Sequence, residues 1–113
     1  MQNRIMYIEF KGNGITGPAR IGRVTFSKSG KSLYYKGRLF LRLSTGGLKA
    51  NYIESETRQE YWISGCKKQG GDRLYSGTIE IDDDVREEYW TEIRGMPDHK
   101  NQKLIRCVGK YSK

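Results

Sequence analysis

Residues 32–43 read S-L-Y-Y-K-G-R-L-F-L-R-L, two runs of strand-forming residues on either side of Lys36-Gly37. A residue pair ending in glycine between two such runs predicts a tight turn, and therefore a β-hairpin. Other runs with alternating side chains, separated by Gly, Ser, Thr and Asp, predict further strands on both sides of this hairpin. These runs are residues 3–11, 19–27, 47–54, 59–65, 73–81 and 103–109.

Short strands at this close spacing, with a single helix, predict a mainly β protein. We expect a small, strongly bent antiparallel sheet or partial barrel, SH3-like or OB-like, with one α-helix in the C-terminal half. The 113 residues are enough for one domain. We therefore predict a single domain over residues 1–113, with a tail that is frayed after about residue 110.

The second strand of the hairpin has two chemically different faces. Leu39, Leu41 and Leu43 point to one side, whereas Arg38, Phe40 and Arg42 point to the other. We expect the leucines to be buried and the arginines to be exposed. On the preceding strand, Tyr34 and Lys36 are expected to share the face of the arginines.

Residues 84–94 are predicted to form the helix. Asp84 has an acid three residues later, which resembles a capping box, and a glycine follows the segment directly. Val85, Tyr89 and Ile93 fall four residues apart and form one apolar stripe. We expect Asp84 to cap the helix and the stripe to pack against the sheet.

The basic residues of the chain are concentrated in one segment. No Asp or Glu occurs between Glu9 and Glu54, and these 44 residues contain nine Lys and Arg. The segment therefore carries a net charge of +9, the whole chain +8, and the remaining residues sum to −1. Because a concentrated positive field attracts polyanions, we predict a polyanionic partner.

Cations and aromatic rings on one sheet face are typical of proteins that bind nucleic acid. Cations neutralise phosphates, and rings stack on unpaired bases, each stack contributing on the order of 1–3 kcal/mol. The predicted helix is acidic and unsuited to a major groove, which favours RNA or single strands over duplex DNA. The predicted nucleic-acid-binding residues are Arg20, Arg23, Lys28, Lys31, Tyr34, Lys36, Arg38, Phe40 and Arg42, with Tyr35 as a further ring that could stack.

Other interpretations stay open. The basic face could be a solvated sheet surface whose Lys and Arg stems cover Tyr and Phe. Residues 80–92 hold seven acids and one arginine, so they could neutralise the basic segment within the molecule. The protein would then be a protein-interaction module or a subunit, anchored by the Tyr and Trp at 61–62 and 89–90. An enzyme is disfavoured, because His99 is the single histidine and the sequence offers no set of a nucleophile, a base and a group that orients the base. We predict no catalytic residues and no cofactor.

Several shorter motifs favour structural roles. G-N-G-I-T-G at residues 12–17 has the glycine spacing of a dinucleotide loop, but a proline and a strand follow it, so we expect a flexible turn. The Asp triplet at residues 82–84 could bind Mg²⁺ or Ca²⁺, but it lacks EF-hand spacing, and helix capping explains at least one of the three residues. Cys66 beside two lysines could be a reactive thiolate, although a small buried side chain is the favoured role. We predict no metal site.

The N-terminal residues lack the apolar run of a signal peptide, and no stretch approaches the roughly 20 apolar residues of a membrane span. We therefore expect a cytoplasmic protein that does not bind membranes. In such a reducing compartment, Cys66 and Cys107 are expected to be free thiols.

Longer strings of the sequence carry a resemblance. They are R-I-M-Y-I-E (4–9), G-P-A-R-I-G-R-V-T-F-S-K (17–28), Y-W-I-S-G-C-K-K (61–68), D-R-L-Y (72–75) and D-V-R-E-E-Y-W-T-E-I-R (84–94). Over nearly all of residues 1–98 the chain resembles a group of small, uncharacterised bacterial proteins of about this length. Some of them carry the name deoxyxylulose-phosphate synthase, a misleading one, since a thiamine-diphosphate synthase is several times longer. The resemblance implies a bacterial, intracellular protein and supplies no catalytic residues.

Overall fold

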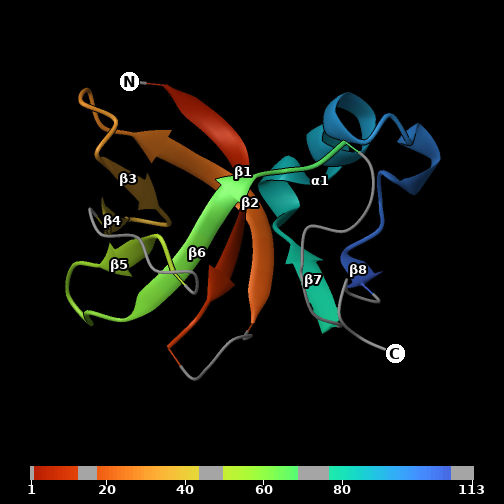
Figure 1. Ribbon diagram of the computed structural model, residues 1–113. Coiled ribbons are helices and arrows are strands. Elements are labelled where there is room, and N and C mark those ends of the chain that lie inside the picture. The colour runs from red at the N-terminus through yellow and green to blue at the C-terminus, as the bar shows by residue number, and fades with distance from the viewer. Residues whose placement is uncertain (1, 13–17, 44–49, 69–76, 108–113) are drawn as a thin grey trace.

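The computed structural model describes residues 2–12, 18–43, 50–68 and 77–107, except for the side chain of Cys107. Within these residues the chain forms eight β-strands, one short helical segment and one 3-10 turn (Figure 1). The strands are β1 (Asn3–Phe10), β2 (Ala19–Phe26), β3 (Ser32–Tyr35), β4 (Arg38–Arg42), β5 (Tyr52–Glu54), β6 (Glu60–Gly65), β7 (Gly77–Ile81) and β8 (Leu104–Cys107).

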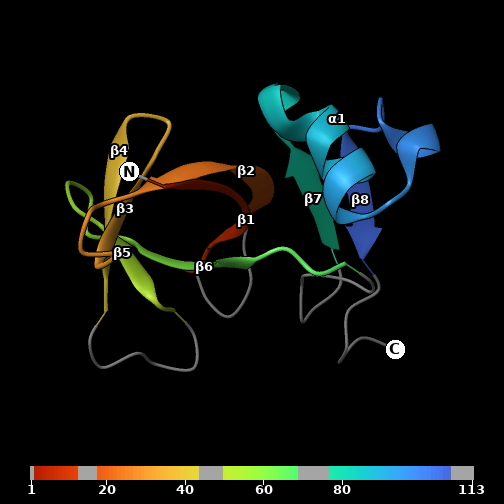
Figure 2. The same ribbon diagram turned by 90° about the horizontal axis from the view of Figure 1, so that it is seen from above.

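Strands β1 to β6 form a closed antiparallel barrel. Each strand pairs with the next, and β1 also pairs with β6, which closes the ring. The first residues of β2 also pair in parallel with β7, and β8 pairs antiparallel with β7. Figure 2 shows the barrel on one side and the β7–β8 pair with the helix on the other. The predicted fold class, a mainly β protein with a small SH3- or OB-like barrel and one helix, is confirmed.

Strand β1 is buried on both faces because it separates two hydrophobic clusters. Met6 and Ile8 point into the barrel, where they join the ring of Phe40 and other apolar side chains. Ile5 and Tyr7 point the other way, into a cluster formed with β7 and the helix. The helix therefore packs on the outside of β1 and β2 and not on the ends of the barrel.

The helical segment runs from Asp83 to Ile93 through three successive geometries: the 3-10 turn η1 (Asp83–Val85), the α-turn α1 (Arg86–Glu88) and the π-turn η2 (Tyr89–Ile93). The predicted helix is thus confirmed, and Val85 and Tyr89 are fully buried, as expected. Ile93 is only partly buried, and Trp90 is buried instead. The stripe shifts because a π-turn places hydrogen bonds five residues apart, as from the Arg94 N–H to the Tyr89 carbonyl at 3.0 Å.

The predicted role of Asp84 as the helix cap is wrong. Asp82 occupies the N-cap position, and its side chain makes no capping hydrogen bond. The Asp82 carboxylate instead turns toward the barrel and accepts hydrogen bonds from Arg20 and Tyr35. The capping argument considered only local sequence, whereas these partners lie on β2 and β3.

The hairpin of β3 and β4 turns at Lys36-Gly37, as predicted. Both residues have positive φ, 51° and 78°, the geometry of a two-residue hairpin turn that glycine adopts without strain. The assignment of the β4 faces is wrong, however. Phe40 is 1% exposed in the barrel interior, and Leu39 and Leu41 are half-buried on the outside.

The two arginines of β4 nevertheless are exposed, as predicted. Arg38 and Arg42 share the inward face with Phe40, but they lie at the two ends of a five-residue strand, where this face reaches solvent. Tyr34 pairs with Leu39 and is therefore on the outer face, not on the face of the arginines. Closure of the barrel explains the difference, because the inward side chain in the middle of β4, Phe40, packs among the other side chains of the barrel core, whereas those at the strand ends reach solvent.

Other predictions have mixed outcomes. The last short strand is confirmed as β8, and the Cys66 thiol donates to the Ile5 carbonyl at 3.7 Å. The side chain of Cys107, residues 13–17 of the glycine motif and the tail after residue 107 lie outside the described residues. In the part of the chain that the structure describes, no helix is long and apolar enough to cross a membrane.

Candidate nucleic-acid interface

The nine predicted binding residues do not form one face. Those at the end of the barrel where β3 turns into β4, here called the barrel mouth, are Arg20, Lys36, Arg38 and Phe40. The opposite end of the barrel, where the turn between β2 and β3 lies, is here called the hairpin end. Its predicted binding residues are Lys28, Lys31 and Arg42. Tyr34 lies between the two ends on the outer face of β3, and Arg23 faces the helix.

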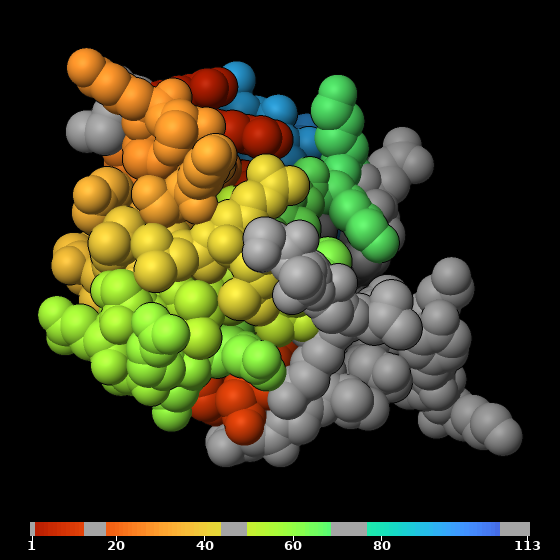
Figure 3. Space-filling model, turned by 60° about the vertical axis from the view of Figure 1, so that its left-hand side comes forward, coloured from red at the N-terminus to blue at the C-terminus, as the bar shows by residue number. Residues whose placement is uncertain are grey.

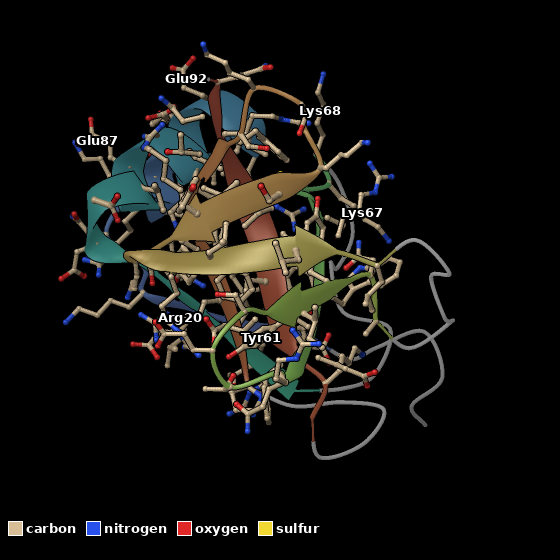
Figure 4. The ribbon with its side chains drawn as sticks, turned by 90° about the vertical axis from the view of Figure 1, so that its left-hand side faces the viewer. Arg20, Tyr61, Lys67, Lys68, Glu87 and Glu92 are labelled. Carbon is tan, nitrogen blue, oxygen red and sulfur yellow. The ribbon has the colours of Figure 1, made fainter. Side chains whose placement is uncertain are left out.

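The barrel mouth contains a cavity of about 340 Å³ with largely apolar walls. Four aromatic rings line it, those of Phe10, Tyr35, Phe40 and Tyr61. The Tyr61 ring meets Phe10 and Phe40 edge to face, with centroids 5.4 and 5.0 Å apart. Figure 4 shows Arg20 and Tyr61 near each other in this part of the molecule, away from Lys67 and Lys68.

A buried carboxylate, Asp82, organises one side of the mouth. It is 4% exposed and accepts hydrogen bonds from Arg20 through Nε at 2.7 Å and Nη2 at 2.6 Å. The Tyr35 hydroxyl donates to it at 2.5 Å. Burial, reinforced by this carboxylate, raises the pKa of Tyr35, so the phenol stays protonated and acts as a donor. The Lys36 Nζ lies 3.6 Å from Asp82, beyond hydrogen-bond distance.

Gly22 provides the space for this network. A Cβ at this position would lie 2.5 Å from the Asp82 carboxylate and 2.5 Å from the Tyr35 ring. Gly12, the first glycine of the predicted turn motif, has a related role, because its Cβ would lie 2.4 Å from the Phe10 ring. Both glycines therefore shape the walls of the mouth.

A second buried carboxylate, Glu54, holds Arg38. Glu54 is 1% exposed, and its Oε1 lies 3.2 Å from Nη2 of Arg38. The Thr57 N–H and hydroxyl both donate to Glu54 at 2.8 Å, and the Glu56 N–H donates at 3.2 Å. These hydrogen bonds, led by the Thr57 N–H, outweigh burial and lower the pKa of Glu54 to about 2. Glu54 therefore remains ionised and fixes the arginine at the rim.

The hairpin end differs in its electrostatics. None of Lys28, Lys31 and Arg42 forms an ion pair with a carboxylate among the described residues. The Arg42 N–H donates to the Lys31 carbonyl at 3.0 Å, which places these two residues side by side. Ser27 and Ser29 order the turn by accepting the N–H groups of Ser32 and Lys31, both at 3.2 Å.

The neutralisation of the basic segment by the acids of residues 80–92 is therefore partial. Arg23 bonds Glu88 on α1 at 2.6 Å, and Arg20 bonds both Glu80 at 2.9 Å and Asp82. Elsewhere in the segment, Lys11 pairs with buried Glu9 at 3.0 Å. The paired cations lie around the mouth and the helix side, whereas the cations of the hairpin end have no acidic partner in the part of the chain that the structure describes.

The structure also revises the predicted aromatic residues. Tyr34 is 44% exposed and available to stack, whereas Phe40 and Tyr35 are buried and reach only the cavity. Tyr89 and Trp90, proposed anchors for a protein partner, belong to η2 and are 0% and 4% exposed, so they pack in the core and not on the surface.

Sequence reasoning missed the residues that fix the mouth: Asp82, Glu54, Phe10 and the ring of Tyr61 as a cavity wall. One usable signal was present, because Glu54 bounds the acid-free segment and lies in a turn with Thr57 three residues later. Among the described residues, no three His, Cys, Asp or Glu side chains lie close enough to hold a metal ion.

Comparisons with protein-family models, curated proteins and solved structures find no match to this chain. The resemblance to a group of small bacterial proteins thus stays a prediction. The candidate interface has two parts: a cation-rimmed aromatic cavity at one end of the barrel, and at the other end Lys28, Lys31 and Arg42, which have no carboxylate partner among the described residues.

Proposed function

We propose that this protein is a binding module for single-stranded nucleic acid, with RNA as the favoured ligand and no catalytic role. One observation carries the proposal: Lys28, Lys31 and Arg42 have no carboxylate partner among the described residues and gather at one end of the barrel. Unneutralised cations release counterions from a phosphate backbone when they bind it, which is the main source of sequence-independent affinity.

The outer face of β3 supplies a path for the strand. Tyr34 lies on this face between the hairpin end and the mouth, with nearly half of its surface exposed. The four residues of β3 span about 13 Å at about 3.3 Å each, so cations at both ends and a ring between them can contact one short strand. The helix carries Glu87, Glu88 and Glu92, which disfavours insertion into a groove of duplex DNA.

The test is the salt dependence of binding to oligo(U) and oligo(dT), measured by fluorescence anisotropy. With three phosphates neutralised, the slope of log K against log salt should be about −2, at about −0.7 per phosphate. The triple variant with Lys28, Lys31 and Arg42 changed to Glu should bind much more weakly and with a shallower slope. If the parent protein binds neither oligo(U) nor oligo(dT) at low salt, the proposal is excluded.

A charge-matched control separates this site from a general effect of net charge. Lys100, Lys103 and Arg106 are exposed near the helix and β8, on the other side of the molecule from β3 (Figure 1). Changing these three residues to Glu removes the same charge and should leave most of the affinity in place. An equal loss of affinity in both triple variants would contradict a site at the hairpin end.

The stacking component has its own test. Tyr34→Ala should weaken binding by about 1–3 kcal/mol with an unchanged salt slope, because stacking releases no counterions. Tyr34→Phe keeps the ring and should bind like the parent. A Phe variant as weak as the Ala variant would show that the hydroxyl, and not the ring, makes the contact.

A protein-interaction module is the second candidate, and a different observation favours it. Tyr34, Leu39, Leu41 and Ile53 share the outer face of β3, β4 and β5, and each is at least partly exposed. Figure 3 shows this face, where these three strands follow one another as orange, yellow and green bands. A partner bound through these side chains would be insensitive to salt, which distinguishes it from a polyanion.

A further inference from the structure

The cavity at the barrel mouth has the walls of a site for a flat ring. Its aromatic side chains come from four different strands of a closed barrel, so their positions are fixed relative to one another. The edge-to-face contacts of Tyr61 with Phe10 and Phe40 leave the aromatic walls facing the cavity. A volume of about 340 Å³ is at the lower end of the range for small-molecule sites, roughly 300–1,000 Å³.

The cations at the rim differ in how many of their hydrogen-bond donors remain for a ligand after their contacts with carboxylates. Arg20 uses Nε, Nη1 and Nη2 on Asp82 and Glu80, so it serves to hold the wall. Lys36 is 3.6 Å from its nearest carboxylate, and its side chain is 56% exposed. Arg38 contacts Glu54 through Nη2, and its side chain is 45% exposed. Lys36 and Arg38 can therefore donate to an anion placed above the cavity.

We propose that the barrel mouth binds one nucleotide, with the base among the aromatic rings and the phosphate on Lys36 and Arg38. This inference rests on the proposed function and extends it, because Lys36 directly follows β3 and continues the path along Tyr34. The nucleotide is either one unstacked unit of a bound strand or a free mononucleotide, since both present a base beside a phosphate.

The pocket should accept different bases. Recognition of a particular base needs hydrogen-bonding groups at its edges, whereas rings stack on any base. The Tyr35 hydroxyl, a polar group of the wall, already donates to Asp82. We therefore expect UMP, CMP and AMP to bind with affinities within about tenfold of one another.

Two variants test the site without damaging the barrel. Lys36→Asn removes one of the two cations that would hold the phosphate and places Asn before Gly37, the pair preferred in a turn with two positive φ angles. Tyr61→Leu removes a wall ring and keeps an apolar side chain on β6. Lys31→Asn at the hairpin end is the matched control, and thermal melting checks that each variant folds.

Isothermal titration calorimetry with UMP as the probe gives the measurement. Lys36→Asn should lower the affinity by about tenfold or more, as expected for a charge-assisted hydrogen bond. Tyr61→Leu should lower it by about five- to 100-fold, as expected for a stacked base. Lys31→Asn should leave it unchanged. Ribose 5-phosphate, which lacks the base, should bind more weakly than UMP.

Competition with oligo(U) assigns the source of the nucleotide. If UMP displaces the oligomer, the pocket takes a nucleotide of the strand; if both bind without competition, the pocket takes the free mononucleotide. Salt-dependent oligomer binding without UMP binding, and with normal affinity in both variants, would overturn the pocket and leave the proposed function intact. UMP binding without any oligomer binding would support the pocket and overturn the proposed function.

Discussion

The two ends of the barrel use basic residues in opposite ways. At the mouth, Arg20 and Arg38 each bond a buried carboxylate, Asp82 and Glu54 respectively. At the hairpin end, Lys31 and its neighbours have no carboxylate partner among the described residues. A count of basic residues in the sequence therefore overstates the free positive charge, because a paired arginine contributes orientation more than attraction.

This difference assigns different tasks to the two ends. An unpaired lysine attracts phosphate at a distance and loses that attraction as salt is added. An arginine fixed by a buried carboxylate has already lost its side-chain freedom, so a ligand that bonds it needs to order less. The hairpin end is thus suited to capture a strand, and the mouth is suited to hold one group in a defined geometry.

Gly22→Ala should have the largest effect, since it inserts a methyl group between the Asp82 carboxylate and the Tyr35 ring. Neither group can move without breaking the network of the mouth, so we expect a loss at or above the upper end of about 1–3 kcal/mol. Urea denaturation measures it. Gly65→Ala is the control, because its Cβ would lie 3.3 Å from the end of the flexible Arg4 side chain. Equal stability of both variants would show that the mouth is not rigid.

Asp82→Asn should have the next largest effect. It keeps the shape of the side chain but removes the charge that Arg20 and the Tyr35 hydroxyl share. We expect a loss of about 1–2 kcal/mol, moderated because Arg20 is partly exposed and regains water. The control is Asp84→Asn, at an exposed side chain, which should lower the free energy of unfolding by less than about 0.5 kcal/mol. A larger loss of stability in Asp84→Asn than in Asp82→Asn would instead support Asp84 as the helix cap.

Glu54 gives the mouth a dependence on pH. Its pKa is about 2 in the folded protein against an ordinary value of 4.5. The stability that it contributes is therefore complete above about pH 4.5 and is lost as the pH falls toward 2. In urea denaturation from pH 6 to pH 2.5, Glu54→Gln should be less stable than the parent at pH 6 and approach it in acid.

The control for this pH profile is Glu56→Gln on the same turn, where the side chain is exposed. It should keep the acid-dependent loss of the parent. A constant difference in stability between the parent and Glu54→Gln at every pH would mean that the carboxylate acts by shape and not by charge.

The strands and the helix could be predicted because their signals are local. Alternation across a strand and the spacing of Val85 and Tyr89 depend only on neighbouring residues. The inward position of Phe40 could not be predicted, since it depends on which strands meet when β1 pairs with β6. The same limit applies to the site, because Arg20 and Asp82 are 62 residues apart in sequence.

The local argument also fails at two of the buried carboxylates, Glu54 and Asp82. Composition suggested that acids would lie on the solvated helix and oppose the basic segment, and Glu88 does so. Glu54 and Asp82 are buried instead, which is costly for a charge unless several donors surround it. Those donors come from turns and strands whose positions only the folded barrel defines.

The smallest expected effect concerns the contact between the helix and the basic segment. Arg23 on β2 and Glu88 on α1 form a partly exposed pair at 2.6 Å, and Arg23 also donates to Asn3 at 3.1 Å. A double-mutant cycle with Arg23→Ala and Glu88→Ala should give a coupling energy of about 0.2–1 kcal/mol. The coupling should shrink as salt is added, because the pair is screened by solvent ions.

The matched cycle combines Arg23→Ala with Glu87→Ala, the exposed neighbouring acid on the same helical turn, and should give a coupling near zero. Equal coupling in both cycles would mean that Arg23 responds to the overall charge of the helix. The contrast between the two ends would then weaken, since a diffuse acidic field could also reach the hairpin end. Coupling confined to Glu88 would leave Lys28, Lys31 and Arg42 without an acidic partner among the described residues, and so available to a ligand.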